Sequence, residues 1–329
     1  MNAAAIQAPL LSVENLGVDY GTPARPLFAV AAASFSLAAG DIVGVAGESG
    51  SGKSTLCTAL IRSLPDSARV TGRIMFNGQS ITEIDARAMR GIRGKDMTMI
   101  LQNPMTALDP LFTIGNQMVE VLARQQPRPE GRLIDHAIAL LRRVHLTAPE
   151  LRVRQYPHQL SGGMKQRVLI AMATACSPKL LLADEPTTAL DATIQEEILL
   201  LFREIRDRLG TAFLLVTHDL SAIKRICDRT IIMYAGRIVE EGPTADIFSA
   251  PQHPYTQALL ASLPRMQDDE ISMSSIPGQV PNLDELPPGC AYANRCPQVM
   301  ASCGARQPAQ TQTASAHRVF CLRYEGVSA

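Results

Sequence analysis

The chain has 329 residues, of which 46% are hydrophobic and 19% charged, and its 31 basic residues balance its 31 acidic residues. This composition excludes a disordered chain, and the balanced charge gives no general indication of nucleic-acid binding. A chain of this length can form one large or two modest domains, each with a hydrophobic core.

No segment is predicted to cross a membrane. The longest nearly apolar run, residues 27–39, spans 13 residues and contains two serines, whereas a spanning helix needs about 20 apolar residues. The first ten residues lack the basic and apolar regions of a secretion signal. We therefore expect a cytosolic protein whose membrane role, if it has one, depends on partners.

Four short apolar runs are predicted to be buried strands. They cover residues 42–46, 97–101, 180–183 and 213–216, and each leads into a glycine or a polar residue. Continuous apolar runs of this length are typical of a parallel sheet covered by helices on both faces. Ligands of such α/β sheets bind beyond the carboxyl ends of the strands.

Between these runs the pattern becomes helical, and near the end it becomes irregular. Apolar residues recur at helical spacing at Ile134, Ala137, Ile138, Leu141 and Val144. We predict a helical subdomain over about 104–176 within a first domain of residues 1–250. Prolines recur from residue 251 onward, so residues 251–329 are predicted to form a small, loop-rich extension.

The first polar stretch after a predicted strand is a phosphate-binding motif. Residues 47–55 match G-x-x-x-x-G-K-[ST], between a strand and a helix. Lys53 is predicted to reach the β- and γ-phosphates and Ser54 to bind Mg²⁺. A glycine-rich turn that binds nothing is the alternative, which the complete motif and its context disfavour. The predicted nucleotide contacts here are Gly47, Ser49, Gly50, Gly52, Lys53, Ser54 and Thr55.

Polar residues at three other strand ends complete this prediction. Asp184 is predicted to hold Mg²⁺, and Glu185 to point in another direction and act as general base on the attacking water. His218 is predicted to bond the γ-phosphate, and Gln102 to hold Mg²⁺ or the water. A solvated strand exit is the simpler interpretation of each residue alone; their common location favours a site.

A second anion-binding helix start follows at Ser161, Gly162 and Gly163, which open an apolar helix. A helix cap that serves stability alone is the simpler interpretation. One phosphate loop has no obvious use for a second such site, so this turn indicates contact with another nucleotide.

Four of the seven cysteines lie in the extension, at Cys290, Cys296, Cys303 and Cys321. Four thiolates suit a closed Zn²⁺ or iron–sulfur site, although the spacing matches neither zinc ribbons nor ferredoxin runs. A site without metal stays an alternative. His317, near Cys321, is predicted to be exposed rather than part of such a site.

These motifs, in this order, resemble the ATPase subunits of ATP-binding cassette (ABC) transporters. The resemblance covers residues 47–55, Gln102, residues 160–166, residues 184–186, residues 189–191 and His218. It implies a head-to-tail ATPase pair in which each ATP lies between the phosphate loop of one subunit and the Ser161 turn of the other. It also implies that Asp191 lies at the subunit seam and that Tyr20 stacks on adenine.

The extension resembles that of dipeptide and oligopeptide importer ATPases, on His253–Thr256, residues 277–278, 289–290 and Asn294–Pro297. This implies a homologous second ATPase, two transmembrane permease subunits, an extracytoplasmic solute-binding protein, and a location on the cytoplasmic face of the inner membrane. Some members carry a [4Fe–4S] cluster on the matching cysteines. Importers of nickel or other small solutes, soluble cassette ATPases and exporter ATPases are the alternatives.

Overall fold

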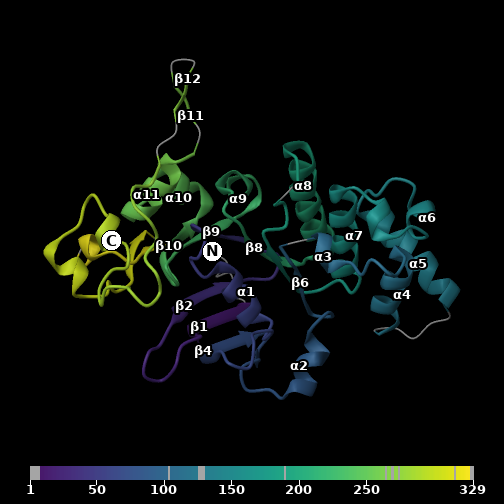
Figure 1. The fold of residues 1–329 in the computed structure, drawn as a ribbon, viewed down its shortest axis with the longest axis horizontal. Helices are drawn as coiled ribbons and strands as arrows, with labels where there is room; N and C mark the ends of the chain where they lie inside the picture. Colours follow the sequence, from purple (N-terminus) through teal and green to yellow (C-terminus); the bar gives the residue numbers. More distant parts are fainter. Residues whose placement is uncertain are drawn as a thin grey trace, which may run out of the picture. The chain divides into compact units, whose positions relative to one another are not determined.

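The computed structural model describes residues 8–102, 104–124, 130–188, 190–263, 265–267, 270–272, 275–314 and 316–326. The chain forms two compact units, and each is described by itself: unit 1 comprises residues 1–82 and 216–329, and unit 2 comprises residues 83–215 (Figure 1). Within the described ranges, no helix is both long and apolar enough to span a bilayer.

Unit 1 contains helices α1 (Lys53–Leu60), α9 (Leu220–Ile226), α10 (Thr244–Ser249) and α11 (Pro254–Ala261). Its strands are β1 (Leu11–Asp19), β2 (Phe28–Leu37), β3 (Ile42–Ala46), β4 (Arg69–Phe76), β5 (Gln79–Ser80), β9 (Arg229–Tyr234), β10 (Arg237–Pro243), β11 (Arg265–Gln267), β12 (Glu270–Ser272), β13 (Thr311–Ala314) and β14 (His317–Val319). In one sheet the order β13-β14-β10-β9-β3 places β3 parallel to β9. Every residue of β3 is buried, as the apolar run 42–46 predicts.

The second sheet of unit 1 is antiparallel, with the order β2-β1-β4-β5. The register of β1 with β2 shifts near Leu16, and two non-glycine residues there have a positive φ, Asn15 at 49° and Ala32 at 52°. Such bulges interrupt the alternation of polar and apolar residues by which an exposed strand is recognised in a sequence. The apolar-run criterion therefore did not reveal this sheet.

Unit 2 contains helices α2 (Ala86–Ile92), α3 (Pro104–Ala107), α4 (Ile114–Ala123), α5 (Glu130–Arg143), α6 (Pro149–Arg152), α7 (Gly162–Thr174) and α8 (Ala192–Leu209). Its strands are β6 (Met97–Ile100), β7 (Leu180–Asp184) and β8 (Ala212–Val216), which ends at the boundary between the units, and β6 pairs with β7 in parallel. The three remaining predicted strands are therefore confirmed. Described residues between 104 and 176 form only helices and loops, and α5 occupies the predicted amphipathic stretch.

The extension, which was predicted to be a loop-rich appendage, adds two strands to the sheet of unit 1. Hairpin β13–β14 continues the sheet, with Glu240 of β10 opposite Val319 of β14. Glu240 is fully buried and pairs with His317, whose Nε2 lies 2.7 Å from Glu240 Oε1. The prediction of an exposed His317 was wrong, because a buried carboxylate needs a hydrogen-bonding partner and His317 provides it.

His253 gives this region a pH-dependent stability. Burial lowers its pKa to about 4, and its Nδ1 accepts the N–H of Tyr255, 3.0 Å away, at the start of α11. The unfolded chain binds a proton below pH 6.5, whereas the folded chain stays neutral down to about pH 4. The contribution of His253 to the free energy of unfolding is therefore expected to be complete above pH 6.5. Acidification should lower the free energy of unfolding, and His253 should account for on the order of 3 kcal/mol of that loss.

Urea unfolding between pH 7 and pH 4.5 measures this dependence. The matched variant is His253→Asn, because asparagine keeps a capping acceptor without titrating in this range. We expect the variant to lose less stability on acidification than the original chain. Equal losses in both proteins would contradict the role given to His253.

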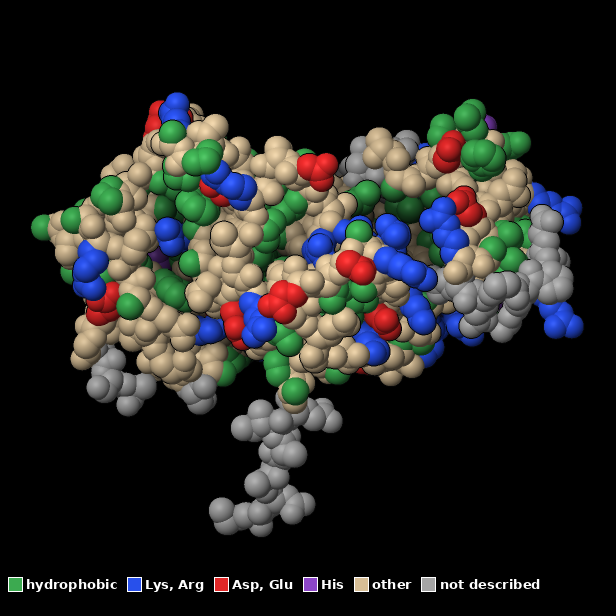
Figure 2. Space-filling model, turned by 90° about the horizontal axis from the view of Figure 1, so that it is seen from below, with side chains coloured by type: hydrophobic (Ala, Val, Ile, Leu, Met, Phe, Trp, Pro, Cys, Tyr) green, Lys and Arg blue, Asp and Glu red, His purple; other side chains and the backbone are tan. Residues whose placement is uncertain are grey.

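On the face of the molecule in Figure 2, Lys and Arg side chains are mixed with Asp and Glu. This agrees with the balanced composition of the chain.

Candidate active site

The phosphate loop connects β3 to α1 in unit 1, as predicted. Gly52 stands just before α1 with φ at 96°, and a Cβ on it would lie 2.2 Å from the carbonyl oxygen of Ala29. Only glycine fits this conformation and this close approach. Ser49, Gly50 and Ser54 are exposed at the loop and the start of the helix, and Thr55 is half-buried.

Lys53 is folded back into the loop. Its Nζ donates to the carbonyl oxygens of Gly47 at 2.8 Å and Glu48 at 2.9 Å, and to Ser51 Oγ at 3.3 Å. The side chain is buried, so these acceptors replace the water that the ammonium loses. Phosphate oxygens are stronger acceptors for an ammonium than neutral carbonyls are. The loop therefore holds a cation where an incoming phosphate can reach it.

In unit 2, Gln102 and Glu185 lie together. Glu185 Oε2 accepts hydrogen bonds from Gln102 Nε2 at 3.0 Å and from Thr188 Oγ1 at 2.9 Å. Asp184, the last residue of β7, is buried, while Glu185 is half-buried. This is a carboxylate held in place by two side-chain donors, next to a buried carboxylate.

The conformation of Glu185 differs from the extended one expected. Its φ is 46°, in the left-handed region, which costs a non-glycine residue on the order of 1 kcal/mol. The side chains of Glu185 and Asp184 therefore point in different directions because of this left-handed turn, and not because of the alternation along a strand. Thr188 was not predicted as a partner, because no sequence pattern indicates this turn. Ala189 of the predicted 189–191 motif lies outside the described residues.

The Ser161 turn begins α7 in unit 2. Ser161 Oγ accepts the N–H of Met164 at 3.3 Å, so the side chain caps the helix. A Cβ on Gly163 would lie 2.7 Å from Ile194 Cγ2 of α8, which explains a glycine there. Asp191 caps α8 through the N–H of Ile194 at 3.0 Å. Ser161 and Asp191 are exposed, and Gly162 and Gly163 are half-buried.

Two further predicted residues belong to unit 1, and each follows a strand. His218 is exposed, two residues after β8. Tyr20 directly follows β1 and is 39% exposed, so its ring is accessible for stacking. Neither side chain is buried in the hydrophobic core, in agreement with a role in binding.

The four cysteines of the extension line one small cavity. Backbone N–H groups bond all four sulfurs: those of Tyr292, Gln298 and Arg323 bond Cys290, Cys296 and Cys321, and that of Met300 lies 3.4 Å from Cys303 Sγ. Burial, and then repulsion from the other three sulfurs, raises the pKa of Cys290 to about 11. Burial likewise raises the pKa of Cys296 and Cys321.

The thiols of Cys290, Cys296 and Cys321 therefore stay protonated near neutral pH unless a cation stabilises their thiolates. Their chemistry and hydrogen bonds fit a thiolate-ligated group. Their present arrangement does not: across the described residues, no group of three or more His, Cys, Asp or Glu side chains is placed to hold a metal ion. The predicted iron–sulfur cluster thus has suitable donors but no preformed metal site.

Comparison with known proteins adds to this geometry. The ABC transporter family model matches residues 30–188, and that of the oligopeptide/dipeptide transporter C-terminal region matches residues 239–303. The dipeptide transport ATP-binding protein DppD of Bacillus subtilis is 44% identical over 314 residues, which cover 95% of this chain and 94% of that protein. The chain belongs to the dipeptide and oligopeptide ABC transporter family.

A second member of this family is almost as similar, and a solved cassette structure shares the fold. The oligopeptide transport ATP-binding protein OppD of Salmonella typhimurium is 41% identical over 94% of this chain and 93% of its own length. A dimeric structure of the ATP-binding cassette MJ0796 with ADP and Pi has a TM-score of 0.63 at 26% identity, over 71% of this chain and 98% of that chain. The predicted α/β cassette fold and ABC-type ATPase assignment are confirmed for this ABC subunit.

Proposed function

We propose that the chain binds Mg-ATP and hydrolyses it as one half of a head-to-tail ATPase pair that drives solute import. The observation that carries this proposal is the presence of two anion-accepting helix starts on one chain, at Gly52 and at Ser161. The first contains Lys53, whose bonds to loop carbonyls are those that phosphate oxygens can take over. This loop already accounts for one nucleotide, so we assign the Ser161 turn to a nucleotide held by the partner subunit.

In unit 1 the residues divide the work of binding. The loop from Gly47 to Thr55 surrounds the phosphates with its N–H groups, and Lys53 exchanges its bonds to loop carbonyls for bonds to the β- and γ-phosphates. Tyr20 stacks on the adenine, and His218 bonds the γ-phosphate. These roles need the exposed positions that Tyr20 and His218 occupy.

In unit 2 the residues divide the work of hydrolysis. Mg²⁺, when bound, would neutralise charge on the phosphates. Asp184 would hold it together with Ser54 of unit 1, and Gln102 would be a further ligand or a contact to the attacking water. Glu185 accepts a proton from that water as general base. Thr188 and Gln102 orient the Glu185 carboxylate, through the hydrogen bonds that they donate to it.

The partner ATPase is proposed to be a homologous second subunit, whose corresponding Ser-Gly-Gly turn closes over this ATP. Asp191 lies at the seam between the two.

Two permease subunits dock on unit 2, which exposes large apolar side chains at Leu101 (53% exposed), Leu111 (78%) and Phe112 (51%). Exposed apolar side chains of this size favour a protein interface. The domains proposed are residues 1–250 for ATP, with a helical subdomain over about 104–176, and 251–329 as the extension.

Di- and oligopeptides are the proposed cargo, delivered by an extracytoplasmic solute-binding protein to a complex at the inner membrane. The names of the related DppD and OppD subunits support this. The test is ATP hydrolysis by the complete complex in liposomes, with binding protein loaded with a dipeptide. We expect stimulation by peptide, and neither binding nor import of nucleic acid. Stimulation by nickel instead would favour the metal importers, and copurification with ribosomes would favour a soluble cassette ATPase.

The four extension cysteines are proposed to ligate a [4Fe–4S] cluster, with zinc or no metal as alternatives. Support comes from the shared cavity and from the N–H groups bonded to the sulfurs. Iron and acid-labile sulfide should both be present in protein purified without oxygen, and Cys303→Ser should lose both. Cys57→Ser, outside the extension, is the control. Protein without iron but with full ATPase activity would contradict the proposal, and zinc in its place would favour the first alternative.

A further inference from the structure

One arginine of the four-cysteine extension forms an ion pair with the phosphate loop. Arg295, the residue before Cys296, forms a two-pronged ion pair with Glu48 of the loop: Nη1 lies 2.8 Å from Oε2, and Nη2 lies 3.1 Å from Oε1. The Arg295 side chain is only 6% exposed. Paired N–H donors on a planar guanidinium fix the carboxylate in orientation as well as in position.

The guanidinium is itself held in place from several sides. Its Nε donates to the carbonyl oxygen of Pro277 at 2.9 Å, and Nη1 donates to Tyr234 Oη at 3.2 Å. The rings of Tyr234 and Tyr292 lie 5.8 and 6.0 Å from its carbon Cζ, within the range of cation–π attraction. Arg295 therefore has little freedom to release Glu48 by turning away.

Glu48 in turn is the second residue of the phosphate loop. Its N–H donates to Tyr255 Oη of α11 at 2.8 Å, and its carbonyl oxygen accepts Lys53 Nζ at 2.9 Å. A shift of Glu48 thus displaces a direct contact of the phosphate-binding lysine. Side chains from residues 234–295 consequently hold a loop that belongs to residues 47–55.

We propose that Arg295 is a positioning residue for ATP, through which the extension keeps the phosphate loop in its binding shape. The inference rests on the proposed function of that loop. Arg295 lies between Cys290 and Cys296. The folded conformation of this segment therefore determines the position of the Arg295 guanidinium. Loss of the cysteine structure should therefore weaken ATP binding at the loop.

The test measures the Kd for Mg-ATP of the full chain by titration, with thermal unfolding in the absence of nucleotide as a separate readout. Arg295→Gln should weaken binding about tenfold, and Glu48→Gln by a similar factor. Together the two changes should cost little more than either alone, because both break the same pair. Arg295→Lys keeps the positive charge but lacks the paired N–H donors of the guanidinium. It should therefore restore only part of the affinity for Mg-ATP.

The matched control is Arg306→Gln, which breaks an ion pair with Glu325, 2.6 Å away, elsewhere in the extension. It should leave the Kd unchanged. An unchanged Kd in folded Arg295→Gln, or additive effects of the two changes, would overturn the inference. If Arg295→Gln does not fold, Glu48→Gln tests the same pair from the loop. Failure of the wild-type protein to bind Mg-ATP would instead contradict the proposed function.

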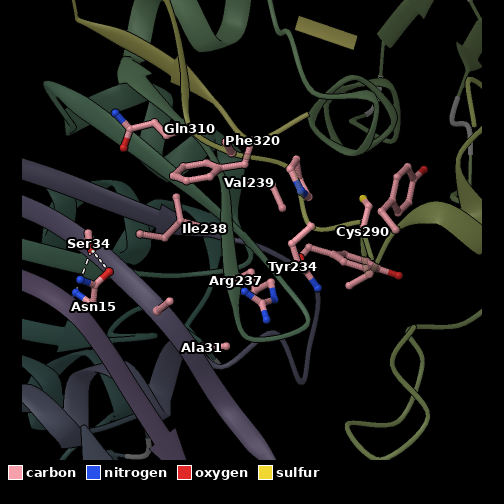
Figure 3. A pocket seen from close by; sticks show the side chains of 16 residues that line it. Asn15, Ala31, Ser34, Tyr234, Arg237, Ile238, Val239, Cys290, Gln310 and Phe320 are labelled. Carbon is pink, nitrogen blue, oxygen red and sulfur yellow. Dashed lines mark hydrogen bonds between the residues drawn. The ribbon is translucent and has the colours of Figure 1, made fainter. Parts of the chain in front are cut away.

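A second inference comes from a cavity of about 340 Å³ in unit 1. Figure 3 shows side chains of β1, β2, the β9–β10 hairpin and the extension around it. Its walls are largely apolar, with Ile238 and Phe320 among them, and Arg237, Asn15 and Gln310 add polar groups. This size and this mixture of surfaces are typical of sites for small organic molecules.

Arg237 lines this cavity without a carboxylate partner. Its guanidinium makes no hydrogen bond or ion pair with any described residue, although the side chain is partly buried and burial lowers its pKa. The carboxamide nitrogen of Asn15 likewise donates to none of them, and Asn15 stands at a bulge with φ at 49°. We infer that the cavity binds a small carboxylate with an apolar body, its anionic end on Arg237.

N-acetyl-leucine and its neutral amide are a matched pair of probes for this site. Calorimetric titration of the full chain should show the acid binding about tenfold more tightly than the amide. Arg237→Gln should remove that preference while leaving Mg-ATP binding unchanged. Equal binding of both probes, or none up to about 10 mM, would overturn this inference.

Discussion

Replacing Glu185 with glutamine is expected to stop ATP turnover while leaving Mg-ATP binding intact. Glutamine is nearly the same size and can keep a hydrogen bond to Thr188, but it cannot accept a proton from water. Loss of a positioned general base typically lowers a rate by about 10²–10⁴-fold. Because Asp184 and the phosphate loop are unchanged, the affinity for nucleotide should stay within about twofold.

Phosphate release by the assembled complex measures turnover, and titration with a non-hydrolysed nucleotide measures binding. Glu204→Gln is the matched control, because Glu204 is an exposed carboxylate of unit 2 that pairs with His145 at 2.8 Å. It should turn over ATP at the original rate. Unchanged hydrolysis in Glu185→Gln would remove Glu185 from the role of base.

Replacing Lys53 with methionine is expected to abolish tight ATP binding. The ammonium contacts two loop carbonyls and Ser51, and these are the bonds that phosphate oxygens would take over. Loss of a charge-assisted contact of about 3 kcal/mol corresponds to about a hundredfold weaker affinity. The change also leaves buried carbonyls unpaired, so some loss of stability should accompany it.

Circular dichroism separates lost binding from lost folding in this variant. Lys179→Met is the control, since Lys179 is a half-exposed lysine 4.0 Å from Asp96 and outside every motif. It should bind Mg-ATP normally. A folded Lys53→Met that binds as tightly as the original chain would contradict the assignment of the loop.

The parts of this fold that the sequence predicts are those with local signals. The buried strands β3, β6, β7 and β8 are continuous apolar runs, and the phosphate loop is a fixed motif with glycines that the backbone requires. Lys53 could be chosen because it belongs to the loop motif, Asp184 because it ends such a strand, and Gln102 because it follows one by two residues.

The parts that the sequence does not predict depend on contacts between distant residues. The ion pair of Arg295 with Glu48 joins positions 247 apart, and nothing near either residue indicates the other. Likewise, the local preferences of Glu185 and Ala32 do not favour the positive φ that both residues adopt. His317 was predicted as exposed because its buried partner, Glu240, lies in another strand.

Light scattering of Glu185→Gln with its homologous partner ATPase, with and without Mg-ATP, tests most directly whether nucleotide joins two subunits. The account predicts separate subunits without nucleotide, and a stable pair holding ATP between the phosphate loop of one and the Ser-Gly-Gly turn of the other. Subunits that stay separate at saturating Mg-ATP would contradict it.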